Sequence, residues 1–340
     1  MGKIYIVTGA AGHLGNTIVR QLTERGERVR ALILPGDGAE GLRGLGARIC
    51  YGDVRYKDTL RMAFDVPPDT QLVVIHCAGI VSIASRVTRQ VYEVNVRGTK
   101  NVADLCLEKH VSKLVYVRSV HAIPERPKGE IIHEVGRFNP KKVKGGYAKS
   151  KAEATQYVLD CAARGLNATV VHPSGIIGPN DYGRGHLTQM IVDYLNGALV
   201  ACVKGGYDFV DVRDAADGTI RAADGGVWGA CYILANRYVG VDELLGVLSK
   251  LSGKRQIKTV LPMWLAKSTA PLAEGYYKIL HRPPLYTSYS LFTLRANAHF
   301  SSERAKKELG YTNRPLEETL QDTVKWLEEH HRIANKAMRN

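Results

Sequence analysis

The stretch that decides the fold is Lys3-Ile-Tyr-Ile-Val-Thr-Gly-Ala-Ala-Gly-His-Leu-Gly15. Its apolar run, Lys3–Thr8, predicts a buried strand, and a helical pattern follows the glycines. Gly9 allows a tight turn out of the strand, Gly12 lets a pyrophosphate approach the backbone, and Gly15 lets the helix pack against the sheet. The free N–H groups and positive dipole end of that helix would hold the phosphates. A glycine-rich turn between a strand and a helix therefore predicts a dinucleotide site.

Outward from this stretch, the first half of the chain alternates apolar runs with helical patterns. The expected strands are Lys3–Thr8, Arg28–Leu34, Arg48–Tyr51, Leu72–Cys77, Lys113–Val117 and Ala168–His172. The expected helices are Gly15–Arg25, Thr59–Phe64, Asn95–Lys109 and Tyr147–Ala163. Continuous apolar runs indicate strands buried on both faces, and their alternation with helices indicates a parallel sheet. The predicted fold class is therefore α/β, a doubly wound parallel Rossmann sheet.

After His172 the alternation stops, and Pro and Gly residues punctuate the chain. Two more strand-like runs, Leu199–Val203 and Cys231–Leu234, precede a final part that is mostly helical in pattern. We expect a Rossmann domain over residues 1–175, with returning segments near 199–235. A smaller, mostly helical substrate cap is expected over 176–198 and 236–330, followed by a basic tail over 331–340.

The composition is that of an ordinary globular protein. The 340 residues are 45% hydrophobic and 24% charged, which excludes collagen, a long coiled coil and wholesale disorder. The net charge of +14 attracts anions, but without zinc spacing or an RNA-binding motif no specific nucleic-acid partner is expected. No apolar run is long enough to span a membrane, no signal-peptide pattern is present, and the six scattered cysteines suit buried thiols. These features favour a cytoplasmic protein, and the histidine spacing predicts no catalytic metal.

The end of the second expected strand bears on the choice of dinucleotide. An Asp or Glu there would bind a ribose 2′-hydroxyl, whereas an Arg would bind a 2′-phosphate. This chain has Leu34 at that point, and Asp37 just beyond it would repel a phosphate. The sequence therefore favours NAD over NADP. Arg28, Arg30 or Arg55 would reverse that preference by turning inward.

A tyrosine and a lysine lie one turn apart in an expected helix. Tyr147 and Lys151 share a helix face because residues four apart are neighbours on it. A phenol is a poor base at neutral pH, and a nearby ammonium lowers its pKa. Ser119 follows an expected strand, at the edge where ligands of open sheets bind, and could hold a substrate oxygen. His121 lies close by and is expected to be a loop histidine with satisfied hydrogen bonds.

Together these motifs resemble the extended short-chain dehydrogenase/reductase family, whose members include NAD-dependent epimerases and dehydratases. The resemblance runs from the first strand to about Leu327 and is strongest to the branch that contains dihydroflavonol reductases and 3β-hydroxysteroid dehydrogenases. The matching segments are Thr8–Gly15, Gly52–Val54, His76–Gly79, Asn95–Thr99, Ser119, Tyr147 with Lys151, His172–Pro179, Phe209–Asp214 and Phe300–Ala305.

The resemblance implies a role for each matching position. Ser119, Tyr147 and Lys151 would be the catalytic residues. The residues implied to contact the cofactor are Gly9, Ala11, Gly12, His13, Leu14, Gly15, Leu34, Asp53, Val54, Cys77, Ala78, Gly79, Asn95, Tyr147, Lys151, His172, Pro173 and Ser174. The adenine would contact Asp53 and Val54, the ribose and pyrophosphate Cys77 to Gly79, and the nicotinamide His172 to Ser174. Asn95 would steady the active-site helix, and a homodimer is implied by analogy alone.

Two positions depart from the family pattern. Leu34 stands where many relatives of this branch carry a phosphate-binding Arg. Arg118 stands where relatives often have a small Ser or Thr, which places a cation beside the expected site. That cation would either bind an acidic substrate group or turn outward.

The resemblance leaves more than one function open. The first is hydride transfer between a nicotinamide cofactor and a carbonyl or secondary alcohol on a steroid-like or flavonoid-like ring. An apolar pocket for such a ring is suggested by Trp264, Tyr276, Tyr277, Leu285, Tyr286, Tyr289 and Phe292. The alternative, a nucleotide-sugar epimerase or dehydratase, needs basic residues in the cap, and these are available at Arg184, Lys204, Arg282 and Arg295. A non-catalytic dinucleotide-binding protein would keep the glycines and lose the catalytic residues.

Overall fold

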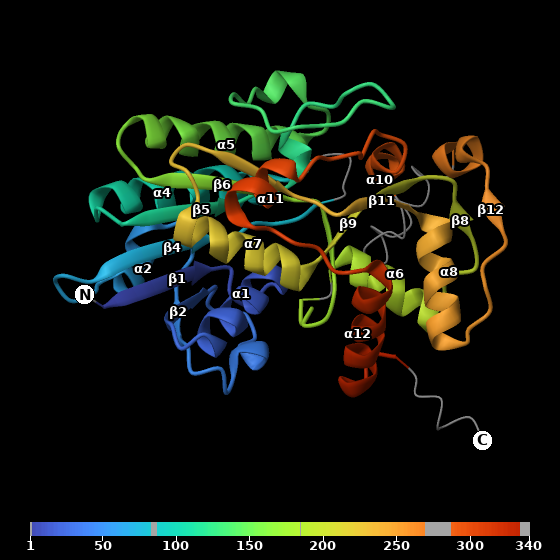
Figure 1. The fold of residues 1–340 in the computed structure, drawn as a ribbon, viewed down its shortest axis with the longest axis horizontal. Coiled ribbons are helices and arrows are strands. Elements are labelled where there is room, and N and C mark those ends of the chain that lie inside the picture. Colours follow the sequence, from blue (N-terminus) through green and yellow to red (C-terminus); the bar gives the residue numbers. More distant parts are fainter. Residues whose placement is uncertain (1, 83–86, 184, 269–286, 334–340) are drawn as a thin grey trace.

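The computed structural model describes residues 2–82, 87–183, 185–268 and 287–333. Its centre is a seven-stranded parallel sheet with the order β10-β6-β5-β4-β1-β2-β3 (Figure 1). The strands are β1 (Lys3–Thr8), β2 (Arg28–Ile33), β3 (Arg48–Tyr51), β4 (Gln71–His76), β5 (Lys113–Val117), β6 (Ala168–Pro173) and β10 (Cys231–Leu234). The chain runs outward in both directions from β1, which confirms the doubly wound Rossmann fold.

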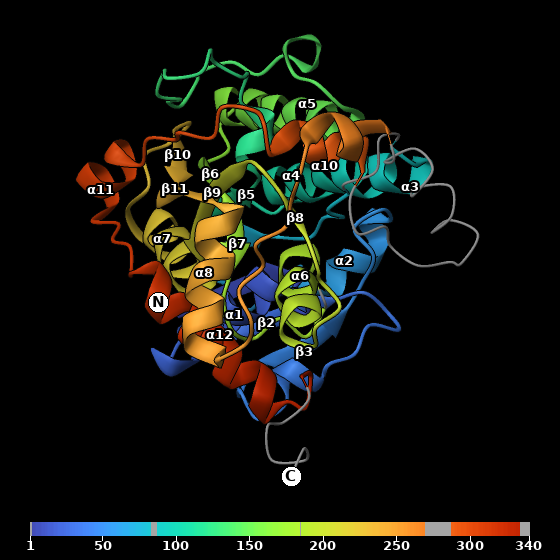
Figure 2. The same cartoon turned by 90° about the vertical axis from the view of Figure 1, so that its right-hand side faces the viewer.

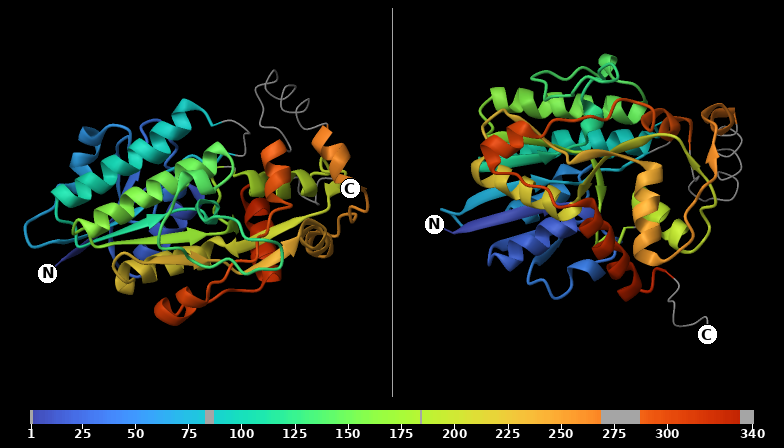
Figure 3. Two further views of the ribbon diagram at one scale, coloured as in Figure 1. Left: turned by 90° about the horizontal axis from the view of Figure 1, so that it is seen from above. Right: turned by 45° about the vertical axis from the view of Figure 1, so that its right-hand side comes forward.

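Helices cover both faces of the sheet (Figure 3). One face carries α1 (His13–Glu24), α7 (Val212–Gly225) and α11 (Glu303–Leu309). The other carries α2 (Lys57–Phe64), α4 (Thr99–Glu108) and α5 (Gly146–Ala163). Each layer of helices buries its own hydrophobic core against the sheet. Because both faces of the strands are buried, their sequences are continuous apolar runs.

The second half of the chain builds a smaller body at one end of the sheet (Figure 2). It contains a three-stranded sheet of β11 (Arg237–Gly240), β9 (Gly206–Asp211) and β7 (Gly175–Ile177), and a two-stranded sheet of β12 (Val260–Leu261) and β8 (Cys202–Val203). Its described helices include α6 (His186–Leu195), α8 (Val241–Ser252), α10 (Ser288–Thr293) and α12 (Leu316–Glu329). A separate core joins α6, α8 and α12.

The segments around these elements differ in places from the sequence-based expectations. Of the segment near 199–235, β10 joins the central sheet, whereas β8 and β9 belong to the small sheets. The expected helix over Asn95–Lys109 is divided into a π-helix, η2 (Glu93–Gly98), followed by α4. Single-turn π-helices occur often at functional sites. The division of the chain into a cofactor domain and a substrate cap stays a prediction.

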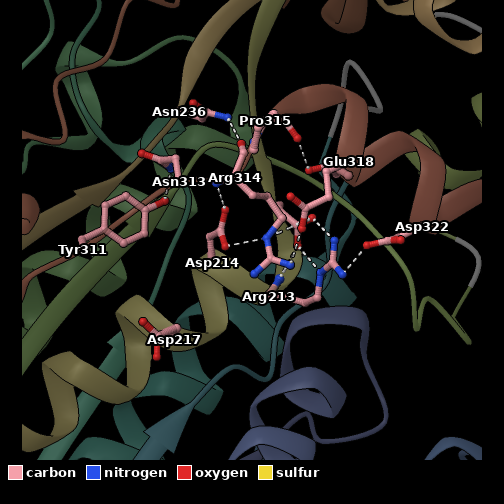
Figure 4. Close-up of polar contacts among 12 residues, drawn as sticks. Arg213, Asp214, Asp217, Asn236, Tyr311, Asn313, Arg314, Pro315, Glu318 and Asp322 are labelled. Carbon is pink, nitrogen blue, oxygen red and sulfur yellow. Dashed lines mark hydrogen bonds and ion pairs between the residues drawn. The ribbon is translucent and has the colours of Figure 1, made fainter.

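A network of ion pairs joins the small body to the central sheet (Figure 4). Asp211 is buried at the start of α7, where it accepts hydrogen bonds from the backbone and side chain of Arg213. The Arg213 guanidinium also binds Asp322 of α12. Arg314, just before α12, donates to Asp214 of α7 at 2.8 Å. These side chains hold α12 against α7, which itself lies on the sheet.

The cysteines and helices show two further features. All six cysteines are free, and all but the half-buried Cys77 are buried, as expected for structural thiols. None of the helices in the described ranges combines the length and the apolar character needed to cross a lipid bilayer.

Candidate active site

The chain runs in opposite directions from the neighbouring strands β1 and β4, and doubly wound sheets bind dinucleotides at such a point. Gly9 leaves β1 with a φ of 66°, a conformation that favours glycine. A Cβ atom on Gly9 would lie 2.7 Å from the backbone of Ala78, which follows β4. The Ala78 N–H also donates to Thr8 Oγ1, so the ends of the two strands are held together. Glycine is therefore required at position 9 for both the turn and the close approach.

The start of α1 is shaped to bind an anion. Gly12 is its N-cap residue, no side chain caps the helix, and its first turn contains no acidic residue. Its first N–H groups are consequently available to a phosphate, with the positive end of the helix dipole behind them. A Cβ on Gly15 would overlap the Gly9 carbonyl, so α1 packs directly on the turn. Around this turn Leu14 is buried, Ala11 is half-buried, and His13 Nε2 lies 2.9 Å from the Pro179 carbonyl. This uncapped cradle fits the pyrophosphate of a dinucleotide.

The other residues that the resemblance implies for the dinucleotide follow β2 and β3. Leu34 follows β2 directly and is 41% exposed. Asp53 and Val54 are nearly buried after β3. The Asp53 carboxylate already binds Arg55, whose Nε lies 2.9 Å from Oδ2. Asp53 therefore has an internal ion pair, for which the sequence carries no signal.

Tyr147 and Lys151 come together in the first turns of α5. Both are almost fully buried, with 5% and 4% exposure, and Lys151 Nζ lies 4.9 Å from the centre of the Tyr147 ring. Gly145 precedes the helix with a φ of 87°, and a Cβ there would lie 2.5 Å from the Tyr289 ring of α10. The glycine thus lets the start of α5 pack against α10.

Ser119 lies two residues beyond the carboxyl end of β5. Its Oγ accepts a hydrogen bond from the His121 N–H at 3.3 Å, and its carbonyl is 3.3 Å from His172 Nδ1. The His121 ring lies 6.1 Å from the Tyr147 ring, centre to centre. His121 therefore links the segment after β5 to the start of α5. The catalytic roles of Ser119, Tyr147 and Lys151 stay predictions.

His121 has a more specific position than a loop histidine. Its ring stacks on Tyr207 of β9, and its Nε2 is 3.0 Å from the Tyr207 hydroxyl. Burial lowers the pKa of His121 to about 4, so the imidazole is neutral at physiological pH. The sequence offered no signal for this pair because the two residues are far apart along the chain.

The residues after β4 pack against η2. The Asn95 side chain bonds both the N–H and the carbonyl of Ile80, each at 2.9 Å. A Cβ atom on Gly79 would lie 3.0 Å from Asn95 Oδ1 and 3.2 Å from Lys151 Nζ. Gly79, Asn95 and Lys151 therefore converge, and only glycine leaves the space between them open.

The remaining implied cofactor residues line the ends of β4 and β6. The Cys77 N–H donates to the Thr8 carbonyl at 3.2 Å. His172 and Pro173 close β6, with the His172 ring stacked on Phe138. Ser174 is 7% exposed, and its N–H donates to the Leu234 carbonyl.

Arg118 turns into the protein. It is 3% exposed and donates hydrogen bonds to the Tyr116 hydroxyl, Thr99 Oγ1 and, at 2.8 Å, the Asn95 carbonyl. The alternative in which this cation turns outward is therefore wrong. Sequence alone left the direction open because a residue that follows a strand can point to either side of the sheet.

A hollow beside Tyr147 encloses a cavity of about 30 Å³. Aromatic and aliphatic side chains supply most of its wall, with Glu125 and Lys144 as the charged residues. Its lining residues are Val120, His121, Ile123, Glu125, Ile132, Val143, Lys144, Ala148, Tyr207, Tyr289, Phe292, Thr293, Ala296, Asn297 and Phe300. Tyr289 and Phe292 were expected there, and Tyr207 and Phe300 were not.

Other residues expected near the substrate lie elsewhere or are not described. Trp264 is 71% exposed and does not line the hollow. Lys204 and Arg295 are also exposed and absent from its wall. Tyr276, Tyr277, Leu285, Tyr286, Arg184 and Arg282 lie outside the described residues.

Comparison with known proteins shows the family of this chain. The model of the NAD dependent epimerase/dehydratase family matches residues 5–231. The chain belongs to this family. Sterol demethylase protein B of Methylococcus capsulatus is 30% identical over 328 residues, which cover 95% of this chain and 98% of that protein. The 3 beta-hydroxysteroid dehydrogenase type 7 of Mus musculus is 29% identical, over 96% of this chain and 95% of that protein.

Among solved structures, the crystal structure of gox2253 superimposes with a TM-score of 0.82 and 31% sequence identity. The match covers 97% of this chain and 99% of that one. The predicted membership in the extended short-chain dehydrogenase/reductase family is thereby confirmed, as is the general class of a nicotinamide-dependent oxidoreductase.

Proposed function

We propose that the protein transfers hydride between a nicotinamide dinucleotide and the carbonyl or secondary alcohol of a hydrophobic ring compound. One observation carries this proposal: the Tyr147 phenol and the Lys151 ammonium are buried together between a phosphate cradle and an aromatic hollow. Ser119, which follows β5, supports the proposal through its neighbour His121, whose ring lies 6.1 Å from the Tyr147 ring, centre to centre.

Each of the three residues has chemistry that suits one part of the reaction. The bound nicotinamide supplies or accepts the hydride. The Ser119 hydroxyl accepts from the His121 N–H, which leaves its own proton free to donate to a substrate oxygen. The Tyr147 phenol gives a proton to that oxygen in the reductive direction and takes it back in the oxidative one. Lys151 Nζ, which no described residue engages in a hydrogen bond, is free to hold ribose hydroxyls and, when it is protonated, to favour the phenolate.

The chemistry of the wall favours a flat hydrophobic substrate, for which the cavity of about 30 Å³ would have to widen. Tyr207, Tyr289, Phe292 and Phe300 provide aromatic faces, and Asn297 and Thr293 provide a few polar groups for orientation. The relatives described above are named for sterol and hydroxysteroid chemistry. A sterol-like ring ketone or alcohol is therefore the substrate class that we propose.

The alternative functions receive less support. A nucleotide-sugar epimerase or dehydratase has to bind a second pyrophosphate, and among the described residues Lys144 is the only cation in the wall of the hollow. Burial of a phenol and an ammonium costs free energy. A non-catalytic dinucleotide sensor gains nothing from that cost, so the buried pair favours a catalytic protein.

For the cofactor we propose a preference for NAD over NADP. Arg30 Nη1 donates to the carbonyls that end α2, including that of Ala63 at 2.8 Å, and so cannot turn to the ribose. Arg28 donates to the Lys3 carbonyl at the opposite end of the sheet, and Arg55 is paired with Asp53. The three arginines that would reverse the preference are thus engaged elsewhere, and the exposed Leu34 offers a phosphate no hydrogen bond.

The proposed reaction is tested by the variant Tyr147→Phe. We expect turnover of a ring-ketone panel to fall by about a thousandfold, because the proton donor is lost. Binding of NADH, measured by the fluorescence of its nicotinamide, should change little. Nucleotide sugars serve as the competing substrate panel, and turnover of those alone would favour the epimerase alternative. Retention of near-normal ketone turnover by Tyr147→Phe would contradict the mechanism.

The cofactor preference is tested by titrating the wild-type protein with NADH and NADPH under identical conditions. We expect the dissociation constant of NADH to be about tenfold lower, since a 2′-phosphate would find no bidentate partner. The variant Leu34→Arg should narrow or reverse the difference. Tighter binding of NADPH by the wild-type protein would overturn the preference.

A further inference from the structure

Three large apolar side chains are exposed on the strand pair β8–β12 and the turn that follows it. Val200, two residues before β8, is 76% exposed, Val260 of β12 is 48% exposed, and Trp264 is 71% exposed. Val260 pairs with Cys202 of β8, and Trp264 follows in the helical residues 263–268. Figure 1 shows this strand pair at the end of the molecule far from the central sheet. Apolar side chains gathered in this way, unlike ones scattered singly, indicate an interaction surface.

The same strand pair carries charge of one sign. Residues 244–273 contain five Lys or Arg and no Asp or Glu, and residues 194–207 contain Lys204 and no acidic residue. No ion pair in the described part of the chain involves any of these cations. Burial and the charge of Asp242 raise the pKa of the Cys202 thiol, so one carboxylate lies near β8, and the cations outnumber it. We call the exposed groups and their flanking cations the β8–β12 surface, which consists of Val200, Lys204, Lys254, Arg255, Lys258, Val260, Trp264 and Lys267.

A lipid bilayer with anionic headgroups fits the chemistry of the β8–β12 surface. Trp is enriched where a membrane meets water, because its ring is amphipathic, and neighbouring Lys and Arg attract anionic headgroups. A second copy of this chain fits poorly, since a symmetric contact through this surface would bring two sets of unpaired cations together. A nucleic acid would use the cations and the Trp264 ring but would leave Val200 and Val260 without an apolar environment.

The β8–β12 surface is connected to the hollow beside Tyr147 through α10. Ala266, two residues after Trp264, packs with Leu291 of α10. Phe292, the next residue of α10, lines the hollow. The surface is therefore one helix away from the wall that would have to widen for a ring substrate.

We propose that the β8–β12 surface docks the protein on an anionic membrane, with Trp264 and the two valines among the lipid headgroups and the first part of the acyl chains. The protein then lies on the bilayer and does not span it. This position suits a ring compound that partitions into lipid, the substrate class proposed above. The docking itself does not depend on the proposed reaction, because it is measured as binding to lipid.

The test is co-sedimentation of the full chain with vesicles of phosphatidylcholine, with and without phosphatidylglycerol. We expect the protein to bind the vesicles that contain phosphatidylglycerol about tenfold more tightly than those of phosphatidylcholine alone. Added salt should weaken the binding, because it screens the attraction between the cations and the headgroups.

Variants of the β8–β12 surface locate the contact. Trp264→Ser should weaken binding to the anionic vesicles by about tenfold, and Lys258→Gln and Lys267→Gln by about fivefold each. The matched controls are Met62→Ser on α2 and Lys109→Gln after α4, which remove an exposed apolar group and an exposed cation from another part of the molecule. Both controls should bind the vesicles as the wild-type protein does.

The fluorescence of Trp264 reports on the contact directly. Lipids brominated in their acyl chains should quench part of the tryptophan emission of the wild-type protein. This quenching should be absent from Trp264→Phe, in which Trp228 and Trp326 remain.

Three results would overturn the proposal. The first is a failure to bind the vesicles that contain phosphatidylglycerol. The second is an equal effect of the β8–β12 variants and the controls, which would mean that net charge alone attracts the vesicles. The third is binding of a DNA duplex, lost in Lys258→Gln and Lys267→Gln, without binding of vesicles, which would assign the surface to nucleic acid. Turnover by Tyr147→Phe is measured separately, so a failure of docking and a failure of the proposed reaction are distinguishable.

Discussion

Asp208 places a carboxyl group in the interior of β9, where it is 1% exposed. Its Oδ1 accepts a hydrogen bond from the Asn236 N–H at 3.0 Å, while Oδ2 has no partner among the described residues. Burial raises the pKa of Asp208 to about 6. The folded protein therefore holds the proton of Asp208 more tightly than the unfolded chain does. The stability that comes from this protonated carboxyl is complete below the unfolded pKa and is lost as pH rises through about 6.

The first prediction follows from this shift. Asp208→Asn should raise the free energy of unfolding by up to about 3 kcal/mol near pH 8, because the ionised carboxylate is no longer buried. The amide keeps an oxygen for the Asn236 N–H. The gain should shrink as pH falls from about 6 and vanish near 3.8. Urea unfolding at several pH values measures it, with the exposed Asp58→Asn as control. A gain that does not depend on pH would contradict the assignment.

Single residues of the site were predictable to different degrees. Tyr147 and Lys151 were found from a spacing of four in a helix, which is a local property of the chain. The inward direction of Arg118 and the pairing of His121 with Tyr207 were not found. Those contacts join residues from different strands, and the surrounding sequence carries no pattern for them.

At the scale of elements, the packing of α1 on the turn after β1 shapes the phosphate cradle. A Cβ on Gly15 would overlap the Gly9 carbonyl and lie 2.9 Å from its carbon and 3.1 Å from Ala10 Cα. These are backbone atoms, which cannot rotate away. The glycine at this position therefore sets the distance between α1 and the turn.

The second prediction concerns this contact. Gly15→Ala should push α1 away from the turn and weaken NADH binding by about tenfold, with a loss of stability of about 1–3 kcal/mol from overpacking. Fluorescence titration and thermal unfolding measure the two effects. Gly136→Ala is the control, since a Cβ at Gly136 meets open space. Unchanged binding in Gly15→Ala would show that the cradle does not hold the dinucleotide.

The strands of the first half were predicted within one residue because their apolar runs are continuous and buried on both faces. The short strands β7, β9 and β11 were not predicted. In β9 the sequence Gly206–Asp211 mixes aromatic residues with two buried aspartates, which obscures the strand pattern. The π-helix η2 was also missed, because its register depends on the contacts of Asn95 with the segment after β4.

At the scale of the whole molecule, ion pairs join α12 of the small body to α7, which lies on the sheet. Arg314 bridges the buried carboxylates of Asp211 and Asp214 at the start of α7, from a position one residue before the cap of α12 (Figure 4). Burial raises the pKa of Asp214, and Arg314 opposes that rise. Removal of Arg314 would leave two buried carboxylates with less compensating charge.

The third prediction follows. Arg314→Met should lower the free energy of unfolding by about 2 kcal/mol, less than for a fully buried pair because the Arg314 side chain is 27% exposed. Chemical denaturation at neutral pH measures this loss. Arg237→Met, which breaks an exposed pair with Glu243, should cost less than about 0.5 kcal/mol. Equal losses in the two variants would contradict the argument from burial.

The amino-acid sequence by itself determined the parallel sheet, the phosphate cradle and the shared helix face of Tyr147 and Lys151. These features depend on periodicity and on residues within a few positions of one another, so local physics is enough to specify them. Tertiary structure decided the burial of Arg118 beside Lys151, the aromatic wall of the hollow and the buried carboxyl of Asp208. Each of these needs segments far apart in the chain to pack together, and the resulting exclusion of water sets the charges that the site can hold.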